Sequence, residues 1–317
     1  MVGCDRRPDR VDVREGRSRR TVDRRRRTVG RWFGVRLKQG GSRYEAVLVS
    51  RYLDHPGRYE LAHRGGAGLG RENVLETFER SFAAGARYLE TDVRITADGV
   101  CVAFHDATLT RTIGVNGKVA DLSYDQIRCL GHSGASVLRI DDLLDALPTA
   151  RFALDLKDAR ALAPLIGLLR DRGDLDRVAL AGARDRWLAA ARAMAGNALS
   201  TALGWESTTR LVTAARVGRL PRHLGRAEFV HVPHRLAGAS VLSDRLIAMA
   251  HELGLKVFVW TVDSPSLMRE LLDRGVDGII TDRPDLLHEV VHALARNIPA
   301  APDVVTSISL DGQSQLV

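Results

Sequence analysis

Short apolar runs alternate with longer amphipathic stretches from residue 59 onward. The runs have the length and composition of strands, and the stretches between them repeat apolar positions at helical spacing. The pattern therefore indicates successive β/α units. We predict strands over residues 60–63, 88–95, 152–157, 178–181, 199–204, 229–232, 256–262 and 278–281.

Helix boundaries in this region carry ordinary start and stop residues. Ser264 and Pro265 stand where a helix begins, and Gly275 stands where it ends. Asn73 precedes another amphipathic stretch, with Glu76 three residues later, so we predict that Asn73 caps a helix there. These boundaries support helices between the predicted strands.

Eight β/α units over residues 59–296 predict an α/β fold, a (β/α)8 TIM barrel in a single domain. The alternative is an open doubly wound sheet, but no Gly-x-Gly-x-x-Gly follows the first strand. Residues 100–105 read as the return arm of a hairpin after the second strand. Residues 107–143 are too long for an ordinary loop and predict a small insertion over the active face.

The positive charge of the chain is concentrated at its start. Residues 1–45 hold 14 Arg and 1 Lys against 6 acidic residues, whereas the remainder holds 32 basic and 33 acidic residues. We predict a disordered Arg-rich tail over 1–45 and a flexible C-terminal tail over 297–317. Three interpretations of the first tail are open: a solvated segment or a predicted start placed too early, an anchor on anionic lipid, or a nucleic-acid contact. The barrel is almost neutral, so we do not expect it to bind nucleic acid.

Several classes of protein are excluded by composition. No apolar stretch reaches the roughly 20 residues of a membrane-spanning helix. Three cysteines are too few and too scattered for a disulfide framework or a zinc cluster. No apolar core of a signal peptide follows the basic start, so a cytoplasmic location is expected.

Charged and imidazole side chains gather toward the ends of three predicted strands and of the hairpin arm over residues 100–105. In a barrel such ends meet at one mouth. Each residue alone has an ordinary explanation, such as a structural histidine or an ion pair. Together they are costly to bury unless metal or substrate neutralises them. These residues are His63, Arg64, Glu90, Asp92, His105, Asp155 and Lys157.

The two carboxylates of the second strand lie on one face. Side chains alternate along a strand, so Glu90 and Asp92 point the same way. A hard cation such as Mg2+ or Ca2+ takes oxygen ligands of this kind. If Asp98-Gly99 forms a two-residue hairpin turn, Asp92 lies opposite His105, and a bulge shifts this pairing by one residue.

These residue types suit hydrolysis of a phosphodiester. Two imidazoles can act as general base and general acid near neutral pH. A divalent cation can polarise a phosphoryl oxygen, and Arg64 and Lys157 can stabilise the phosphate. The chain has no serine nucleophile elbow, P-loop or cysteine nucleophile. Metal-assisted hydrolysis is therefore the predicted reaction.

The sequence resembles the glycerophosphodiester phosphodiesterase family in three stretches. They are AHRGG…ENVLETFERSFAAGARYLETDVRITADGVCVAFHDATLTRT, FALDLK and VFVWTVDSPSLMRELLDRGVDGIITDRPDLL. The resemblance covers roughly residues 59–292. It implies a (β/α)8 barrel with a small insertion, and hydrolysis of glycerophosphodiesters to glycerol 3-phosphate and an alcohol.

The resemblance also implies roles for individual residues. Glu72 and Trp260 have alternatives, since Glu72 also suits a helix start and Trp260 suits barrel packing. The implied roles are general base for His63, general acid for His105, metal ligands for Glu90, Asp92 and Asp155, phosphate binding for Arg64 and Lys157, contact with the glycerol end for Glu72, and an aromatic beside the substrate for Trp260.

Two positions depart from the family pattern. The third metal ligand is usually Glu, and Asp155 is one methylene shorter. The family often shows Pro-Glu-Asn-Thr where this chain has Arg71-Glu72-Asn73-Val74, which removes a threonine hydroxyl. The first difference bears on the metal site, and the second bears on substrate contacts.

Two other functions stay open at this point. A phospholipase D-like enzyme on the same barrel would cleave lysophospholipids or sphingomyelin. Alternatively, the barrel would be inactive, and the basic tail would bind nucleic acid or an anionic membrane with strong salt dependence.

Overall fold

The computed structural model describes residues 35–40, 43–48, 50–130 and 137–296. Eight parallel strands form a nearly closed barrel, in the order β8-β7-β6-β4-β3-β13-β12-β9. A bridge between Ala202 and Phe229 joins the two ends of this order. The predicted TIM barrel is therefore confirmed. The strands are β3 Tyr59–Ala62, β4 Tyr88–Ile95, β6 Arg151–Leu156, β7 Val178–Gly182, β8 Ser200–Thr201, β9 Phe229–Pro233, β12 Lys256–Trp260 and β13 Gly278–Thr281.

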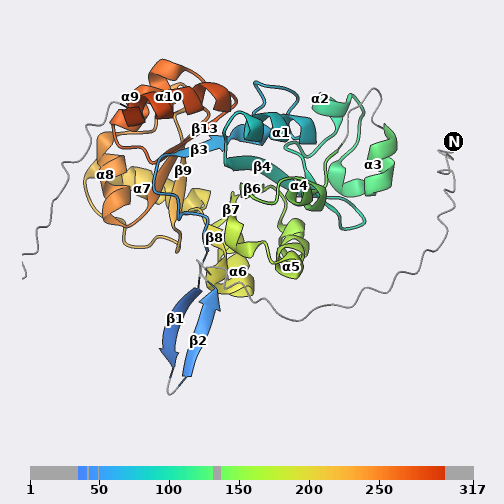
Figure 1. The fold of residues 1–317 in the computed structure, drawn as a ribbon, viewed down its shortest axis with the longest axis horizontal. Helices are drawn as coiled ribbons and strands as arrows, with labels where there is room; N and C mark the ends of the chain where they lie inside the picture. Colours follow the sequence, from blue (N-terminus) through green and yellow to red (C-terminus); the bar gives the residue numbers. More distant parts are fainter. Residues whose placement is uncertain (1–34, 41–42, 49, 131–136, 297–317) are drawn as a thin grey trace, which may run out of the picture.

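Helices surround the strands (Figure 1). Their buried faces are apolar, and the helix that begins after Ser264 has Pro265 in its first turn, as predicted. The helices are α1 Leu75–Ala83, α4 Ile140–Ala146, α5 Leu162–Arg172, α6 Asp185–Ala195, α7 Trp205–Val217, α8 Asp244–Glu252, α9 Pro265–Asp273 and α10 Pro284–Arg296.

One local prediction is wrong, and another is decided between its two stated outcomes. Asn73 does not cap α1; it has a φ of 58°, and its side chain accepts a hydrogen bond from Thr91 Oγ1 at 2.8 Å instead. In the hairpin of β4 with β5 (Cys101–Ala103), Val93 pairs with Ala103, so Asp92 lies opposite Phe104 rather than His105. The turn is one residue longer than a two-residue loop, which is the shift expected from a bulge.

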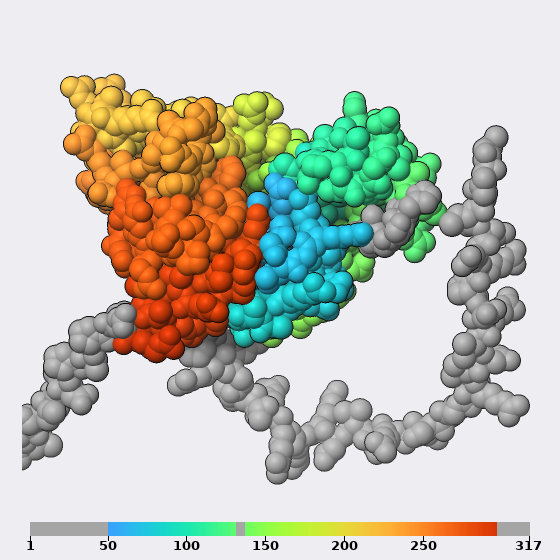
Figure 2. All heavy atoms as spheres, turned by 90° about the horizontal axis from the view of Figure 1, so that it is seen from above, coloured from blue at the N-terminus to red at the C-terminus, as the bar shows by residue number. Residues whose placement is uncertain are grey.

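The insertion after the hairpin forms a lobe at one side of the molecule (Figure 2). Its described part contains α2 Thr110–Ile113, α3 Tyr124–Leu130 and a small apolar cluster of its own. This cluster includes Leu109, Val119 and Ile127, which are fully or almost fully buried. The predicted insertion is therefore a packed element and not an open loop.

An antiparallel pair of strands, β1 Val35–Gly40 and β2 Arg43–Leu48, lies outside the barrel (Figure 1). This pair was not predicted, because we read residues 1–45 as disordered. The alternation of Val35 and Leu37 with Arg36 and Lys38 is the pattern that indicates a strand there. Residues 1–34 and the predicted tail 297–317 lie outside the described residues.

The barrel interior changes character along its axis. At one end it is filled by rings, with Tyr52 wedged against Tyr88 and Phe229 at centroid separations of 5.2 and 5.8 Å. Tyr59 and Phe258 complete this aromatic layer. Since side chains alternate along strands, residues two positions later point into the barrel one layer higher. Polar groups such as Glu90, Asp155 and His231 share that layer with apolar residues, and they are described below.

None of the helices in the described residues is both long and apolar enough to cross a bilayer.

Candidate active site

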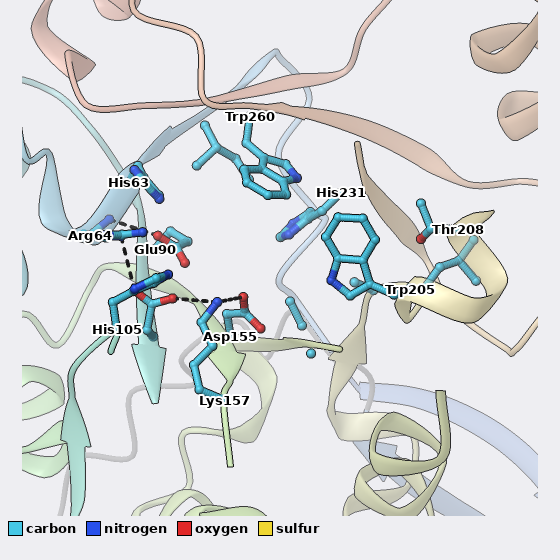
Figure 3. A pocket seen from close by; sticks show the side chains of 16 residues that line it. His63, Arg64, Glu90, His105, Asp155, Lys157, Trp205, Thr208, His231 and Trp260 are labelled. Carbon is cyan, nitrogen blue, oxygen red and sulfur yellow. Dashed lines mark hydrogen bonds and ion pairs between the residues drawn. The ribbon is translucent and has the colours of Figure 1, made fainter. Parts of the chain in front are cut away.

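The carboxyl ends of the strands enclose a cavity of about 130 Å³ (Figure 3). Of the nine predicted site residues, Glu72 alone does not line this cavity. Its carboxylate instead accepts a hydrogen bond from the Arg64 side chain. The structure therefore brings residues from distant parts of the chain around one space. The eight that line it are His63, Arg64, Glu90, Asp92, His105, Asp155, Lys157 and Trp260.

Strand parity and register place the carboxylates. Tyr88 points into the barrel, so Glu90 and Asp92 on the same strand also point inward, and both are buried. Asp92 is the register partner of Asp155 on β6, which puts the third carboxylate one strand away. Three acidic side chains thus share one side of the cavity.

The turn after β3 brings a backbone donor to this carboxylate group. Arg64, Gly65 and Gly66 have positive φ values of 49°, 83° and 93° in succession. Only glycine adopts this region freely, and an added Cβ at Gly66 would lie 2.3 Å from Ser81 Oγ. The resulting bend lets the Arg64 N–H donate to Glu90 Oε2 at 2.9 Å.

Two cations balance the charge of Asp92 and Asp155. Lys157 Nζ lies 3.0 Å from Asp92 Oδ1 and 2.6 Å from Asp155 Oδ2. Although burial opposes it, the two carboxylates raise the pKa of Lys157 well above its ordinary value, so the ammonium stays charged. Arg64 Nε lies 3.4 Å from Asp92 Oδ2 on the other side.

Glu90 is a buried carboxylate whose charged form is disfavoured. Burial, and next the charge of Asp92, raise the pKa of Glu90 to about 7. A carboxylate accumulates this kind of shift when it lacks sufficient positive charge around it. Among the described residues Glu90 makes no ion pair, whereas Asp92 and Asp155 each contact Lys157.

Each catalytic candidate imidazole is held by a carboxylate. His63 Nδ1 bonds Asp282 Oδ1 at 2.7 Å, from the turn after β13. Burial opposes protonation of His63, but the hydrogen bond with Asp282 and the charge of Glu90 outweigh it and raise the pKa of His63. Among the described residues Nε2 of His63 has no hydrogen-bond partner, so this nitrogen is free for a substrate.

His105 has a similar arrangement. Its Nδ1 bonds Asp106 Oδ1 at 2.6 Å, and Arg111 Nε donates to Asp106 Oδ2 at 2.6 Å. The hydrogen bond from Arg111 is the main reason that the pKa of Asp106 falls to about 2. Arg111 also donates to both carboxylate oxygens of Glu72, which ties the insertion to the segment before α1. Both rings lie on the charged side of the cavity (Figure 3).

The donor chemistry of the three carboxylates fits a hard divalent cation. Asp92 Oδ2 is buried and, like the facing Arg64 Nε, makes no hydrogen bond to a described residue. As the side chains stand, no three Asp, Glu, His or Cys residues in the described ranges are grouped to hold a metal ion, and Lys157 lies between Asp92 and Asp155. The three carboxylates thus suit a cation by their oxygen donors and by the register of their strands, while the side chains themselves are not grouped around one point.

The opposite side of the cavity is aromatic and uncharged (Figure 3). Trp205, at the start of α7, and Trp260, at the end of β12, meet edge to face with ring centroids 6.2 Å apart. Thr208 and His231 line the same side. Trp260 therefore both packs and faces the cavity, so its two sequence interpretations do not exclude each other.

His231 is a cavity residue that the sequence analysis did not identify. Burial, and next the charge of Lys157, lower the pKa of His231 to about 3, so its ring is neutral. Its Nε2 is buried and has no hydrogen-bond partner among the described residues. Strand parity could have found it, because Phe229 points into the barrel and His231 follows two positions later.

Asp282, Arg111 and Trp205 were also not predicted. Asp282 and Arg111 belong to stretches that carry the family resemblance, but nothing local in the sequence pairs them with His63 or Asp106. Trp205 directly follows a predicted strand end, which is where cavity residues are expected in a barrel.

Known proteins show the same family and fold. Residues 63–286 match the glycerophosphoryl diester phosphodiesterase family. "Probable glycerophosphodiester phosphodiesterase 2" of Mycobacterium tuberculosis is 36% identical over 251 residues, which cover 76% of this chain and 94% of that protein.

Two solved structures share the fold at lower identity. The glycerophosphodiester phosphodiesterase of Thermotoga maritima aligns with a TM-score of 0.60 and 22% identity, over 74% of this chain and 100% of that one. An Oleispira antarctica phosphodiesterase, solved with its product sn-glycerol-3-phosphate, aligns with a TM-score of 0.60 and 18% identity, over 73% and 96%. With a family match over most of its length and this barrel mouth, the chain belongs to the glycerophosphoryl diester phosphodiesterase family of phosphoric diester hydrolases.

Proposed function

We propose that this enzyme hydrolyses glycerophosphodiesters to glycerol 3-phosphate and an alcohol, with two histidines as general base and general acid and with a divalent cation. The observation that carries the proposal is the cavity itself. It combines two carboxylate-held imidazoles, two cations and three carboxylates on one side, opposite an uncharged aromatic side. This division suits a substrate with an anionic phosphate and an organic group that carries no negative charge.

The imidazoles supply proton transfer at Nε2. Asp282 fixes Nδ1 of His63, and Asp106 fixes Nδ1 of His105, so each ring presents the other nitrogen to the cavity. We assign His63 as the base that accepts a proton from the attacking water, whose oxygen forms the new bond to phosphorus as the bond to the alcohol oxygen breaks. His105 is then the acid that gives a proton to the leaving alcohol oxygen.

Glu90, Asp92 and Asp155 would hold the cation, Mg2+ or Ca2+. When bound, it would supply Lewis-acid activation of a phosphoryl oxygen and lower the pKa of a water molecule beside it. The shorter Asp155 stands beside Asp92 in register, and this proximity supports its place in the set. The cation would lower the pKa of Glu90, because a nearby positive charge favours the charged form of a carboxylate.

Arg64 and Lys157 stabilise the phosphate. Both already contact Asp92, and both line the cavity. Their charges face the position where negative charge develops on the phosphoryl oxygens. Glu72 holds Arg64 at 3.1 Å, so we assign Glu72 a positioning role beside the glycerol end of the substrate.

The test is release of glycerol 3-phosphate from glycerophosphocholine and glycerophosphoethanolamine by the purified full chain. We expect product with Mg2+ or Ca2+ and little product with a chelator. No product with either cation from folded protein would refute the proposed function.

The family match and the residues that line the cavity support a hydrolase over an inactive barrel. An inactive barrel with a binding tail does not account for two oriented imidazoles, and a lysophospholipid substrate requires a site for an acyl chain. Comparing water-soluble with acylated diesters in the same assay distinguishes a glycerophosphodiesterase from a lysophospholipid-cleaving enzyme.

A further inference from the structure

The outer surface of α7 differs from the rest of the barrel in its charge. Residues 207–227 contain five arginines and one histidine and no acidic residue, although the chain after residue 45 is almost neutral. We call the exposed arginines and large apolar side chains of residues 207–227, which comprise most of α7 and the segment that follows it, the α7 basic surface. They are Arg210, Arg216, Val217, Arg219, Leu220, Arg222 and Arg226.

Most of these arginines are not used inside the protein. Among the described residues, Arg216, Arg219 and Arg222 make no ion pair, and Arg210 has a single weak one, 3.5 Å from Asp185. Other exposed arginines behave differently: Arg160, for example, is fixed by Asp158 at 2.7 Å. The charge of the α7 basic surface therefore projects into solvent without a counter-ion.

Large apolar side chains are exposed in the same place. Val217 is 65% exposed and Leu220 is 51% exposed, and these are two of the three highest values for large hydrophobic residues in the described ranges. Together with Arg210, Arg219 and Arg222 they line a surface groove of about 410 Å³. Exposed apolar side chains that are grouped together and rimmed by polar residues are typical of an interaction site.

The α7 basic surface lies on the C-terminal part of α7 and on the segment after it, apart from the cavity. Leu211, Ala214 and Ala215 bury the other face of α7 against the barrel. A helix of 13 residues is roughly 20 Å long, so its last turn is far from Trp205 at its start. The basic surface can thus be occupied while the cavity stays open.

We propose that the α7 basic surface docks onto an anionic phospholipid surface. Arginines beside a negatively charged leaflet are attracted to its headgroups, and Val217 and Leu220 can enter the boundary between headgroups and acyl chains. Nucleic acid is the other polyanion, but a phosphate backbone offers no apolar phase for these two side chains. Binding of this kind is peripheral, and it would bring a hydrolase of lipid-derived diesters to a membrane.

The test compares two variants of the full chain with equal net charge. One is R216E/R219E/R222E, and the matched control is R128E/R269E/R296E, which reverses three exposed arginines on other helices. Both keep residues 1–45, so any contribution of that segment is the same. Sedimentation with vesicles of 30% phosphatidylglycerol in phosphatidylcholine at 0.15 M salt measures binding, and thermal unfolding checks that each variant folds.

We expect the α7 variant to need roughly 100-fold more lipid for half-maximal binding, because each arginine at an anionic leaflet contributes about a factor of five. The control should change far less. V217S/L220S should weaken binding by roughly 10-fold without changing net charge. Equal losses in the two charge variants, or no loss in the α7 variant, would overturn the proposal.

A single-stranded 20-nucleotide DNA serves as the competing ligand. If DNA binding depends on the three arginines while vesicle binding does not, the surface is a nucleic-acid contact and the lipid proposal is wrong. If vesicle binding alone depends on them and on Val217 and Leu220, the proposal holds.

Discussion

The two sides of the cavity are built from the same barrel but by different physical means. The charged side takes its groups from the ends of β3, β4 and β6, where Asp92 and Asp155 touch cationic side chains and Glu90 accepts from a backbone N–H. The aromatic side takes Trp205, His231 and Trp260 from the strands and helices on the other half, and its one titratable ring is kept neutral. The difference teaches that reaction and recognition are separable in this site: one side binds the phosphate, and the other surrounds a group without negative charge.

The largest effect is expected from the imidazoles. His63→Ala or His105→Ala should lower kcat by about 10²–10⁴-fold, the usual contribution of a general acid or base. The measurement is the rate of glycerol 3-phosphate release at saturating cation. His292→Ala on α10, outside the cavity, is the control. Near-normal turnover in either variant would remove that histidine from its assigned role.

Asp282→Asn tests how the charged side holds its base. Loss of the orienting carboxylate should reduce kcat/KM on the order of 100-fold. His63 acts as a base only when it is deprotonated, and its raised pKa places the acidic limb of the profile above the ordinary histidine value. Removing Asp282 should therefore move this limb to lower pH.

The control for that change is Asp285→Asn, since Asp285 pairs with Arg283 and not with a histidine. An acidic limb that stays in place in Asp282→Asn would contradict the coupling between Asp282 and His63.

Glu90→Gln should stabilise the metal-free protein while it weakens cation binding. The pKa of Glu90 is raised to about 7 in the folded state, so the folded protein binds the proton more tightly than the unfolded chain does. The free energy of unfolding should then fall as pH rises from the ordinary glutamate value to about 7. The variant lacks this loss and should be more stable by about 1–3 kcal/mol at pH 8, but not at pH 4.

Urea denaturation with a chelator at the two pH values measures this, with Glu79→Gln on exposed α1 as the control. The same variant should need a higher cation concentration for activity. A pH dependence of stability that is equal in wild type and variant would exclude Glu90 as its source.

The smallest effect is expected on the aromatic side. Trp205→Ala should raise KM by about 3- to 10-fold and change kcat little, because an aromatic pair contributes about 1 kcal/mol and touches no reacting group. Glycerophosphocholine and glycerophosphoethanolamine should respond unequally. Leu253→Ala, an exposed change elsewhere, should leave both unaltered. A loss in kcat alone would contradict the claim that the aromatic side contributes to recognition and not to the reaction.

Much of the barrel and its mouth follows from local pattern. Strand β4 and strand β13 have the predicted bounds, and the acidic pair of β4 points inward because a strand has a period of two. The ends of parallel strands must meet at one edge, so distant residues such as His63 and Asp155 could be assigned to one site from the sequence.

What could not be predicted depends on contacts between distant residues. Asp282 meets His63 across 219 positions, and Tyr52 fills the barrel end from a segment without periodicity. Asn73 looks like a helix cap, but a buried hydrogen bond from Thr91 takes its side chain elsewhere. The hairpin register differs by one because Thr96 Oγ1 accepts from the Val100 N–H and donates to Asp98, which supports a longer turn.

The most direct test of the charged side is a crystal structure with Ca2+ and glycerol 3-phosphate bound. The account predicts one cation on oxygens of Glu90, Asp92 and Asp155, with Lys157 moved from between the two aspartates to the phosphate. It also predicts Nε2 of His63 and of His105 facing the phosphate. A cation held elsewhere, or a phosphate on the side of Trp205 and His231, would contradict it.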